Sequence, residues 1–266
     1  MSSLEYTPPE YTTDEMMTVE AARQLADGDV CFVGIGLPSA AANLARLTHA
    51  PEIVLIYESG TIGTKPDVLP LSIGDGELAD TSLTVVSVPE IFRYWLQGGR
   101  VHIGFLGAAQ IDRFANINTT VIGDYDAPTV RLPGAGGAPE IAGQAGEVLI
   151  ILRQSAKTFV DKLDFITSVG FLDGGDARDK LGLPGRGPSK VITDLGVMVP
   201  DPVSRELTLV QLHPGVSADQ VRAKTGWALK VADSLTTSTP PTAAELEALR
   251  ALHARTARAH AAGGQS

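Results

Sequence analysis

Short apolar segments alternate along this chain with segments that carry the signals of a helix start. Several apolar segments are followed directly by glycine or a polar residue, and their length is typical of buried strands. Strands that alternate with helices indicate an α/β protein with an open, largely parallel sheet and flanking helices. The predicted strands are 30–33, 53–57, 84–86, 101–106, 148–152, 191–193 and 207–212.

Capping boxes mark where several helices begin. In a capping box, an N-cap Ser or Thr and a Glu or Gln on the following turn each accept a hydrogen bond from the other residue's backbone. The pairs are Thr12 with Glu15, Ser87 with Glu90, Ser217 with Gln220, and Thr242 with Glu245. We predict helices over 12–25, 40–47, 87–97, 217–226 and 242–260, a long surface loop over 173–187, and one domain over 1–266 with flexible tails at 1–11 and 261–266.

Composition argues against several classes of protein. The formal net charge is −10 and Lys and Arg are not clustered, so nucleic acid is not an expected partner. Cys31 is the single cysteine, which favours core packing and a reducing cytoplasm over a disulfide. The polar start of the chain is unlike a signal peptide, and no apolar run is long enough to cross a membrane. No group of His, Cys, Asp and Glu has metal-ligand spacing. We therefore predict a cytoplasmic protein with no membrane segment and no metal site.

Candidate site residues follow the predicted strands. Ligands of open α/β sheets bind beyond the carboxyl ends of the strands. Four segments fit that position: the glycine turn at 34–36, the segment Glu58-Ser59-Gly60, the polar segment 107–113 with Gln110, and the glycine cluster 134–137. We expect these segments to meet at one edge of the sheet.

Glu58 is the candidate with the clearest chemistry. It directly follows an apolar strand, and Ser59 and Gly60 allow backbone amides to approach it closely. A carboxylate in such a place can act as a covalent nucleophile when an activated acyl group is held against it. The same pattern also suits a glutamate that only ends a strand and caps a turn.

The glycine segments are open to two interpretations each. Gly136 and Gly137 expose amides that can stabilise an oxyanion, although such a cluster also suits a flexible connection. Gly34 and Gly36 resemble part of a dinucleotide-binding fingerprint, but Ser39 stands where the third glycine belongs, which favours a plain strand-to-helix turn.

Taken together, these motifs resemble the beta subunits of class I CoA-transferases over nearly the whole chain. Within that family the sequence is most similar to the 3-oxoadipate CoA-transferase branch of aromatic-ring catabolism, with the glutaconate CoA-transferases as near neighbours. Many family members have Ser-Glu-Asn-Gly around the nucleophile, where this chain has Tyr57-Glu58-Ser59-Gly60. The motifs that carry the resemblance are 34–39, 57–60, 69–78, 92–99, 107–113, 134–137, 193–196 and 212–215.

The resemblance implies CoA transfer from succinyl-CoA to 3-oxoadipate through a glutamyl-CoA thioester on Glu58. It implies an alpha subunit as partner, in a heterodimer or an α2β2 assembly. It implies no permanently bound cofactor, because the CoA thioester is itself a substrate. The candidate oxyanion and substrate-binding residues are Ser59, Gly60, Gln110, Gly136 and Gly137, and the candidate CoA- or acyl-binding residues are Gly34 and Gly36.

Other functions remain open from the sequence. The acceptor could be glutaconate or another dicarboxylate, and an acyl-CoA hydrolase could share the fold. A nicotinamide-dependent oxidoreductase would use Gly34, Gly36 and Glu58, and a sugar-phosphate sensor would be non-catalytic. The loss of the third fingerprint glycine argues against the oxidoreductase, and the retention of Glu58 favours transfer.

Overall fold

A computed structural model describes residues 10–263 of the chain. The proposed tails therefore fall largely outside the described residues, at 1–9 and 264–266. The last helix, α8 (Ala243–Gly263), runs beyond the predicted end at His260, so residues 261–263 are helical rather than part of a tail.

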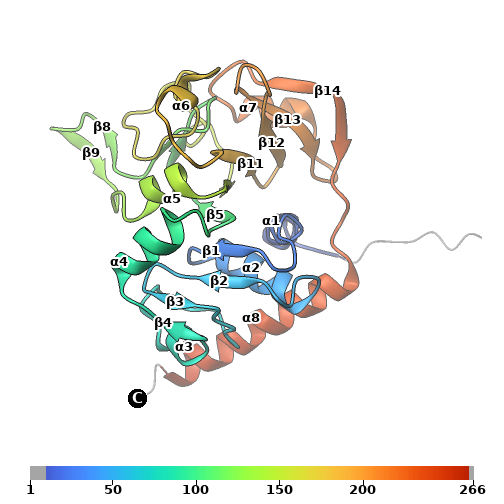
Figure 1. Ribbon diagram of the computed structural model, residues 1–266. Helices are drawn as coiled ribbons and strands as arrows, with labels where there is room; N and C mark the ends of the chain where they lie inside the picture. Colours follow the sequence, from blue (N-terminus) through green and yellow to red (C-terminus); the bar gives the residue numbers. More distant parts are fainter. Residues whose placement is uncertain (1–9, 264–266) are drawn as a thin grey trace, which may run out of the picture.

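A ten-stranded sheet forms the centre of the molecule (Figure 1), with the strand order β14-β13-β12-β11-β10-β5-β1-β2-β3-β4. The strands are β1 (Val30–Phe32), β2 (Val54–Ile56), β3 (Thr61–Ile62), β4 (Thr84–Val85), β5 (Ile103–Leu106), β10 (Glu147–Ile151), β11 (Pro188–Ile192), β12 (Gly196–Pro200), β13 (Leu207–Leu212) and β14 (Lys230–Thr237). Two small antiparallel pairs stand apart from it: β6 (Gln110–Ile111) with β7 (Ile117–Asn118), and β8 (Val121–Gly123) with β9 (Pro128–Arg131).

The middle of the large sheet is parallel. Strands β2, β1, β5, β10 and β11 pair in parallel, whereas β3 and β4 on one side and β12 and β13 on the other join in antiparallel fashion. The prediction of a largely parallel α/β sheet is thus confirmed at its centre. The chain runs from β1 outward to β2 and then returns to β5 on the other side of β1, which makes a topological switch point between β1 and β5. Ligands of such sheets bind at this point.

Helices cover both faces of the parallel strands. The helices α1 (Thr13–Ala22), α2 (Leu37–Leu47) and α8 pack on one another over one face, and α8 runs along the lower edge in Figure 1. On the other face, α5 (Ala138–Gln144) packs on β5 and β10 and also contacts the π-helix η1 (Ile91–Leu96), which continues the short α4 (Val88–Glu90). The remaining helices are α3 (Gly76–Asp80), α6 (Ala177–Lys180) and α7 (Ala218–Ala223).

Alternation along the strands builds the two hydrophobic layers. In β10, Val148 and Ile150 belong to the cluster beneath α5, while Leu149 and Ile151 belong to the cluster beneath α1 and α2. Successive side chains of a strand point to opposite faces, so a short apolar run with no polar member is what a strand covered on both sides requires. Cys31 lies fully buried in the second cluster, as predicted for a packing residue.

Several local predictions are confirmed and several are wrong. The capping boxes of Thr12 and Ser217 are formed, and Thr242 exchanges the same hydrogen bonds with Glu245. Ser87 is the N-cap of α4, but its side chain makes no capping hydrogen bond, so the predicted box is absent there. Helix α2 begins at Leu37 rather than at residue 40 because Pro38 fits its first turn.

The predicted loop over 173–187 is more firmly held than the sequence suggested. It contains the one-turn helix α6, and Arg178 of that helix is 3% exposed. The guanidinium donates hydrogen bonds to the carbonyl oxygens of Gly185, Gly170 and Ala142 at 2.7–3.0 Å. A polar, glycine-rich segment is therefore fastened to the core by a buried cation.

Candidate active site

Glu58 owes its position to the strand before it. Tyr57 faces the core, where its hydroxyl lies 2.9 Å from Ser39 Oγ, and burial raises the pKa of Tyr57 to about 12. Glu58 begins the turn that follows the strand, and its side chain is half-buried and lines the space beyond the strand end. The strand that ends at Ile56 thus delivers a carboxylate beyond its carboxyl end.

The turn after Glu58 depends on Gly60. Its φ of +105° lies in the region that favours glycine, and a Cβ at this position would lie 2.0 Å from the carbonyl oxygen of Val86. Gly60 N–H donates to Tyr57 O at 3.0 Å, which closes the turn around Glu58. Gly60 therefore shapes the turn that carries Glu58, and its predicted contact with substrate stays a prediction.

Ser59 has an unusual environment for a hydroxyl. Its Oγ is buried, and no hydrogen-bond partner for it is found among the described residues. Buried hydroxyls nearly always have a partner, so the missing partner of Ser59 Oγ is an exception next to Glu58 in the chain, although Ser59 lines neither of the two hollows that meet at Glu58. Its predicted role in substrate binding stays a prediction.

The glycine cluster lies directly against Glu58. A Cβ built on Gly137 would lie 3.0 Å from Glu58 Oε1 and 2.6 Å from Cζ of Phe92, and a Cβ on Gly136 would lie 3.9 Å from Glu58 Oε1. No acceptor for the backbone N–H of either glycine is found in the described part of the chain. Backbone amides without an acceptor close to the carboxylate are candidate donors to an oxyanion.

Two hollows meet at Glu58, and Gly137 lines both. The larger has a volume of about 600 Å³ and lies over the carboxyl ends of β1 and β5, which is the switch point of the sheet. The smaller, of about 310 Å³, lies between Glu58 and the segment that contains α4 and η1. A substrate atom at Glu58 would therefore have groups extending from it in two directions.

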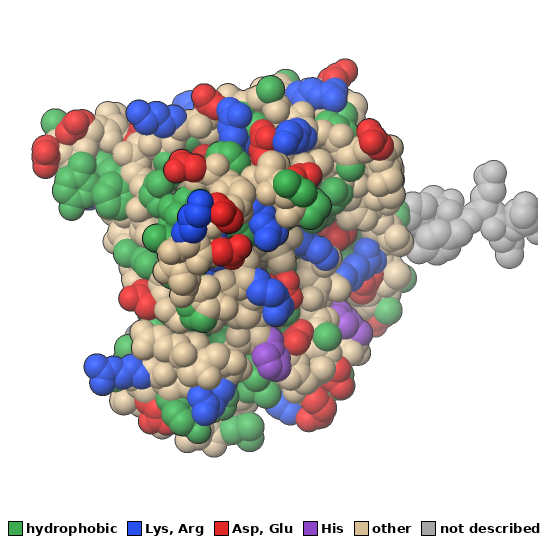
Figure 2. Space-filling model, turned by 45° about the horizontal axis from the view of Figure 1, so that its top comes forward, with side chains coloured by type: hydrophobic (Ala, Val, Ile, Leu, Met, Phe, Trp, Pro, Cys, Tyr) green, Lys and Arg blue, Asp and Glu red, His purple; other side chains and the backbone are tan. Residues whose placement is uncertain are grey.

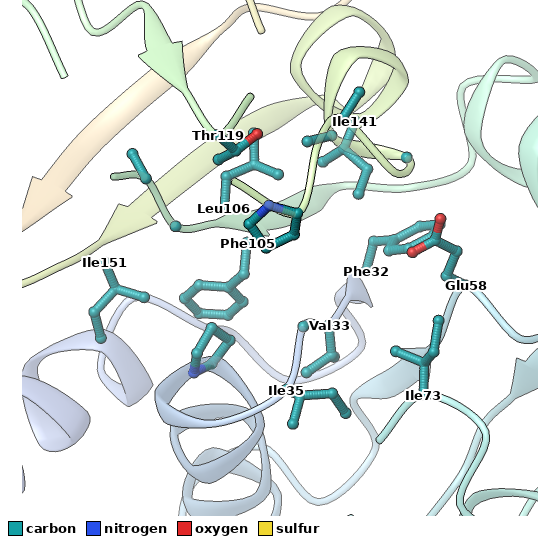
Figure 3. A pocket seen from close by; sticks show the side chains of 18 of the residues that line it. Phe32, Val33, Ile35, Glu58, Ile73, Phe105, Leu106, Thr119, Ile141 and Ile151 are labelled. Atoms are coloured by element: carbon teal, nitrogen blue, oxygen red, sulfur yellow. The ribbon is translucent and has the colours of Figure 1, made fainter. Parts of the chain in front are cut away.

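The larger hollow, called the apolar cleft below, is lined mainly by apolar side chains. Figure 3 shows Glu58 and Ile73 at one side of it and Ile151 at the other, with Phe105 and Val33 between them. Gly34 lines this cleft, together with Gly107, Ala108 and Ala109 after β5. Among the described residues that line it, Glu58 is the one with a charged side chain. The cleft suits an aliphatic chain whose reactive end meets the carboxylate.

The smaller hollow, called the arginine hollow below, is formed by a segment that sequence reasoning did not assign to the site. Phe92, Arg93 and Gln97 line it, opposite Glu58 and Gly137. Phe92 and Arg93 belong to the π-helix η1, whose wider turn is rare and frequently marks a functional site. The only signal in the sequence was that segment 92–99 carries part of the family resemblance.

Gln110 and Gly36 lie apart from the other candidates. Gln110 is on β6, where its amide donates to Asp164 at 2.8 Å and its carbonyl accepts from Asn118 at 2.7 Å. It is not among the described residues that line either hollow. Gly36 is the N-cap of α2, with φ +83°, and does not line the apolar cleft although Gly34 does. The structure thus brings together Glu58, Gly137, Gly136 and Gly34 at the two hollows, whereas Ser59 lies next to Glu58 in the chain without lining either hollow.

Metal and membrane features were sought over residues 10–263. That range contains no group of His, Cys, Asp and Glu that could hold a metal ion. None of its helices combines the length and the hydropathy needed to cross a membrane. On the face shown in Figure 2, Lys and Arg are interspersed with Asp and Glu rather than gathered in a basic patch.

The fold and the site place a half-buried carboxylate, Glu58, at the switch point of an α/β sheet, and known proteins identify the class. A model of the coenzyme A transferase family matches residues 14–224. One subunit of the 3-oxoadipate CoA-transferase of Pseudomonas knackmussii is 68% identical over 96% of this chain and 98% of that protein. The corresponding subunit of the glutaconate CoA-transferase of Acidaminococcus fermentans is 36% identical over 86% and 88% of the two chains.

A solved structure agrees with the sequence relatives. The crystal structure of glutaconate coenzyme A-transferase from Acidaminococcus fermentans matches with a TM-score of 0.86 and 33% identity, covering 92% of this chain and 95% of that one. The chain belongs to the coenzyme A transferase family. The family resemblance predicted from the sequence motifs is confirmed.

Proposed function

We propose that this chain is the catalytic beta subunit of a transferase that moves CoA from succinyl-CoA to 3-oxoadipate, with Glu58 as the nucleophile. The observation that carries the proposal is the carboxylate of Glu58 lying against the backbone of Gly136 and Gly137, where two hollows meet. The choice of 3-oxoadipate rests on the relative that is 68% identical over nearly the full chain and is named for that substrate.

The first half of the reaction loads CoA onto the protein. A Glu58 carboxylate oxygen attacks the thioester carbonyl carbon of succinyl-CoA, the C–S bond breaks, and a mixed anhydride and a CoA thiolate result. The thiolate then attacks the Glu58 carbonyl carbon, and succinate leaves. A glutamyl-CoA thioester remains on Glu58.

The second half reverses these steps with the other acid. The carboxylate of 3-oxoadipate attacks the glutamyl carbonyl, displaces the CoA thiolate and forms a new anhydride with Glu58. The thiolate attacks the acyl carbon of that anhydride, which releases 3-oxoadipyl-CoA and restores the Glu58 carboxylate. Each step exchanges one activated carboxyl group for another, so the cycle needs no other energy source.

The surrounding residues suit these steps. Each addition places negative charge on a carbonyl oxygen, and the amides of Gly136 and Gly137, whose backbone lies against Glu58, would donate to it. The apolar cleft suits the hydrocarbon of the CoA arm. The energy of binding that arm can lower the barrier at the reacting carbon. Water must be kept from the anhydride, which favours closure of the site by a second subunit.

We propose that an alpha subunit provides that closure, because the 3-oxoadipate and glutaconate relatives are each named as one subunit of a larger transferase. Neither a heterodimer nor an α2β2 assembly is favoured by the chain alone. A cytoplasmic location stays a prediction from the single buried thiol and from the thioester substrate.

The mass of the chain after reaction with succinyl-CoA tests the proposal. The complex with the alpha subunit is mixed with succinyl-CoA in the absence of an acceptor, and the intact mass of the beta chain is measured with and without borohydride. We expect a mass increase of one CoA less one water, which borohydride removes and which is absent in Glu58→Gln. The matched control is Glu52→Gln, which removes an exposed carboxylate before β2 and should leave the adduct unchanged.

The outcomes separate the possible activities. An adduct that 3-oxoadipate discharges to 3-oxoadipyl-CoA supports the proposal in full. An adduct discharged only by another dicarboxylate would keep the mechanism and replace the acceptor. Free CoA that accumulates with no adduct and no acceptor would indicate an acyl-CoA hydrolase and refute covalent transfer.

A further inference from the structure

We propose that Arg93 binds the non-reacting carboxylate of both the acyl donor and the acceptor acid, and so selects dicarboxylates. This inference rests on the function proposed above and adds a residue that determines substrate class. Succinyl-CoA and 3-oxoadipate share one feature besides the reacting end, which is a second carboxylate that must be held while the first one reacts. A cation near Glu58 is the group that such substrates require.

Arg93 is the one Lys or Arg among the described residues that line the two hollows at Glu58. Its side chain is exposed, and it has no ion-pair or hydrogen-bond partner in the part of the chain that the structure describes. The neighbouring Arg100, in contrast, is held by the carbonyl oxygens of Tyr94 and Gly98 at 2.8 and 3.2 Å and lies over the Tyr94 ring. Arg93 is therefore a cation available to a ligand.

The backbone that carries Arg93 is fixed close to the nucleophile. In the π-helix η1, Gln97 N–H donates to Phe92 O at 2.8 Å, a bond across five residues instead of four. Phe92 packs on Gly137 and tilts against Phe32, with ring centroids 5.9 Å apart. Arg93 follows Phe92 directly, so the same contacts hold it at the arginine hollow that Glu58 lines from the other side.

The two hollows divide the substrate between them. A distal carboxylate in the apolar cleft would lose its hydration and find no cation there, which is costly. In the arginine hollow it meets a guanidinium, whose planar donors match a carboxylate in two parallel hydrogen bonds. The acyl chain then extends from Glu58 toward Arg93, and the CoA arm extends into the apolar cleft.

Glu140 is the charged group that opposes this interaction. It also lines the arginine hollow, and it is exposed. A second carboxylate there repels the anionic end of the substrate, so Arg93 has to outweigh it. Removal of the Glu140 charge should lower KM for dicarboxylates.

The test compares matched substrates in the complex of the chain with its alpha subunit. The donors are succinyl-CoA and butyryl-CoA, and the acceptors are 3-oxoadipate and 3-oxohexanoate, so that each pair differs in the distal carboxylate alone. We expect Arg93→Met to lower kcat/KM roughly ten- to hundredfold for the dicarboxylates, the range for loss of a hydrogen bond to a charged group, and to leave the monocarboxylates within about twofold.

Two further variants control this experiment. Arg93→Lys keeps the charge but not the paired geometry, so it should recover part of the lost dicarboxylate activity. Arg100→Met removes the same charge from an exposed arginine of the same region, and should leave the preference for dicarboxylates unchanged.

Each outcome bears on the inference. An equal loss for all four substrates would assign Arg93 to CoA binding or to folding and overturn it, as would an unchanged preference in Arg93→Met. A wild-type enzyme that forms the Glu58 adduct but prefers monocarboxylates would refute both the role of Arg93 and the choice of 3-oxoadipate as acceptor. Covalent transfer through Glu58 would still stand. If the acceptor is another dicarboxylate, that acid and its monocarboxylate analogue replace the second pair.

Discussion

Replacement of Gly137 by alanine tests whether close approach to the backbone is what positions Glu58. Gly137 has φ −86° and ψ 3°, a conformation that residues other than glycine also adopt, so the main effect of the substitution is steric. The new Cβ would lie 2.6 Å from Phe92 Cζ, whereas carbon atoms in contact prefer about 3.5–4.0 Å. Phe92 or the start of α5 must therefore move by about 1 Å.

That displacement should change both the free energy of unfolding and the rate of reaction. Extra volume in a packed site costs about 1–3 kcal/mol of unfolding free energy. A misplacement of 1 Å at a reacting centre costs about 100-fold in rate. We therefore expect Gly137→Ala to fold, to melt a few degrees lower, and to form the glutamyl-CoA adduct about 100 times more slowly, as measured by intact mass against time.

The controls separate stability from positioning. Gly143→Ala adds a methyl group to the same helix at a place where the nearest atom, Leu183 Cδ2, is 3.6 Å away, so it should keep the wild-type rate. Adding Phe92→Leu to Gly137→Ala removes the ring contact and should restore stability, while the 3.0 Å approach to Glu58 Oε1 keeps the rate low. A folded Gly137→Ala protein with the wild-type rate would refute the reasoning.

Three further predictions concern stability and reactivity. Arg178→Met leaves buried carbonyl oxygens without donors and should lower the unfolding free energy by about 3 kcal/mol in urea titrations; a change below about 1 kcal/mol would contradict the anchoring role. Hydrogen bonding to Arg250 lowers the pKa of Glu15 to about 2 from 4.5. The contribution of Glu15 to the free energy of unfolding is therefore complete above pH 4.5 and is lost as pH falls through about 2. Glu15→Gln should therefore destabilise the protein at neutral pH and be neutral near pH 2, and an equal difference at both values would contradict the pairing. Burial raises the pKa of the Cys31 thiol, so a thiol reagent should modify it only after unfolding, which a colorimetric time course in and out of urea would check.

Local signals in the sequence were sufficient for several elements because the interactions behind them span few residues. The capping boxes of Thr12, Ser217 and Thr242 join residues on one helical turn and form as predicted. Ser87 has the same signal, but the chain there enters a π-helix that packs against α5, and no capping hydrogen bond forms. Tertiary packing overrides a local preference of this size.

Gln110 follows the end of a central strand but lines neither hollow at Glu58. It follows the central strand β5, as Glu58 follows β2, yet the chain turns at once into the β6–β7 pair. That pair is held by contacts with residues far along the chain, including Asp164, and these engage the side chain of Gln110. No spacing rule within the segment could have shown that the amide turns away.

The sequence by itself determined the α/β class, the central strands and the carboxylate at the end of one of them, because apolar length and turn residues are properties of short segments. Tertiary structure decided which segments meet at that carboxylate. Gly136 and Gly137 approach Glu58 from a segment far along the chain. Phe92 and Arg93 line the arginine hollow opposite Glu58 from a π-helix, which the hydrophobic pattern of the sequence did not predict. The physical reason is that a site at a switch point is assembled from the ends of separate strands and helices, and their distances are set by packing across the whole sheet.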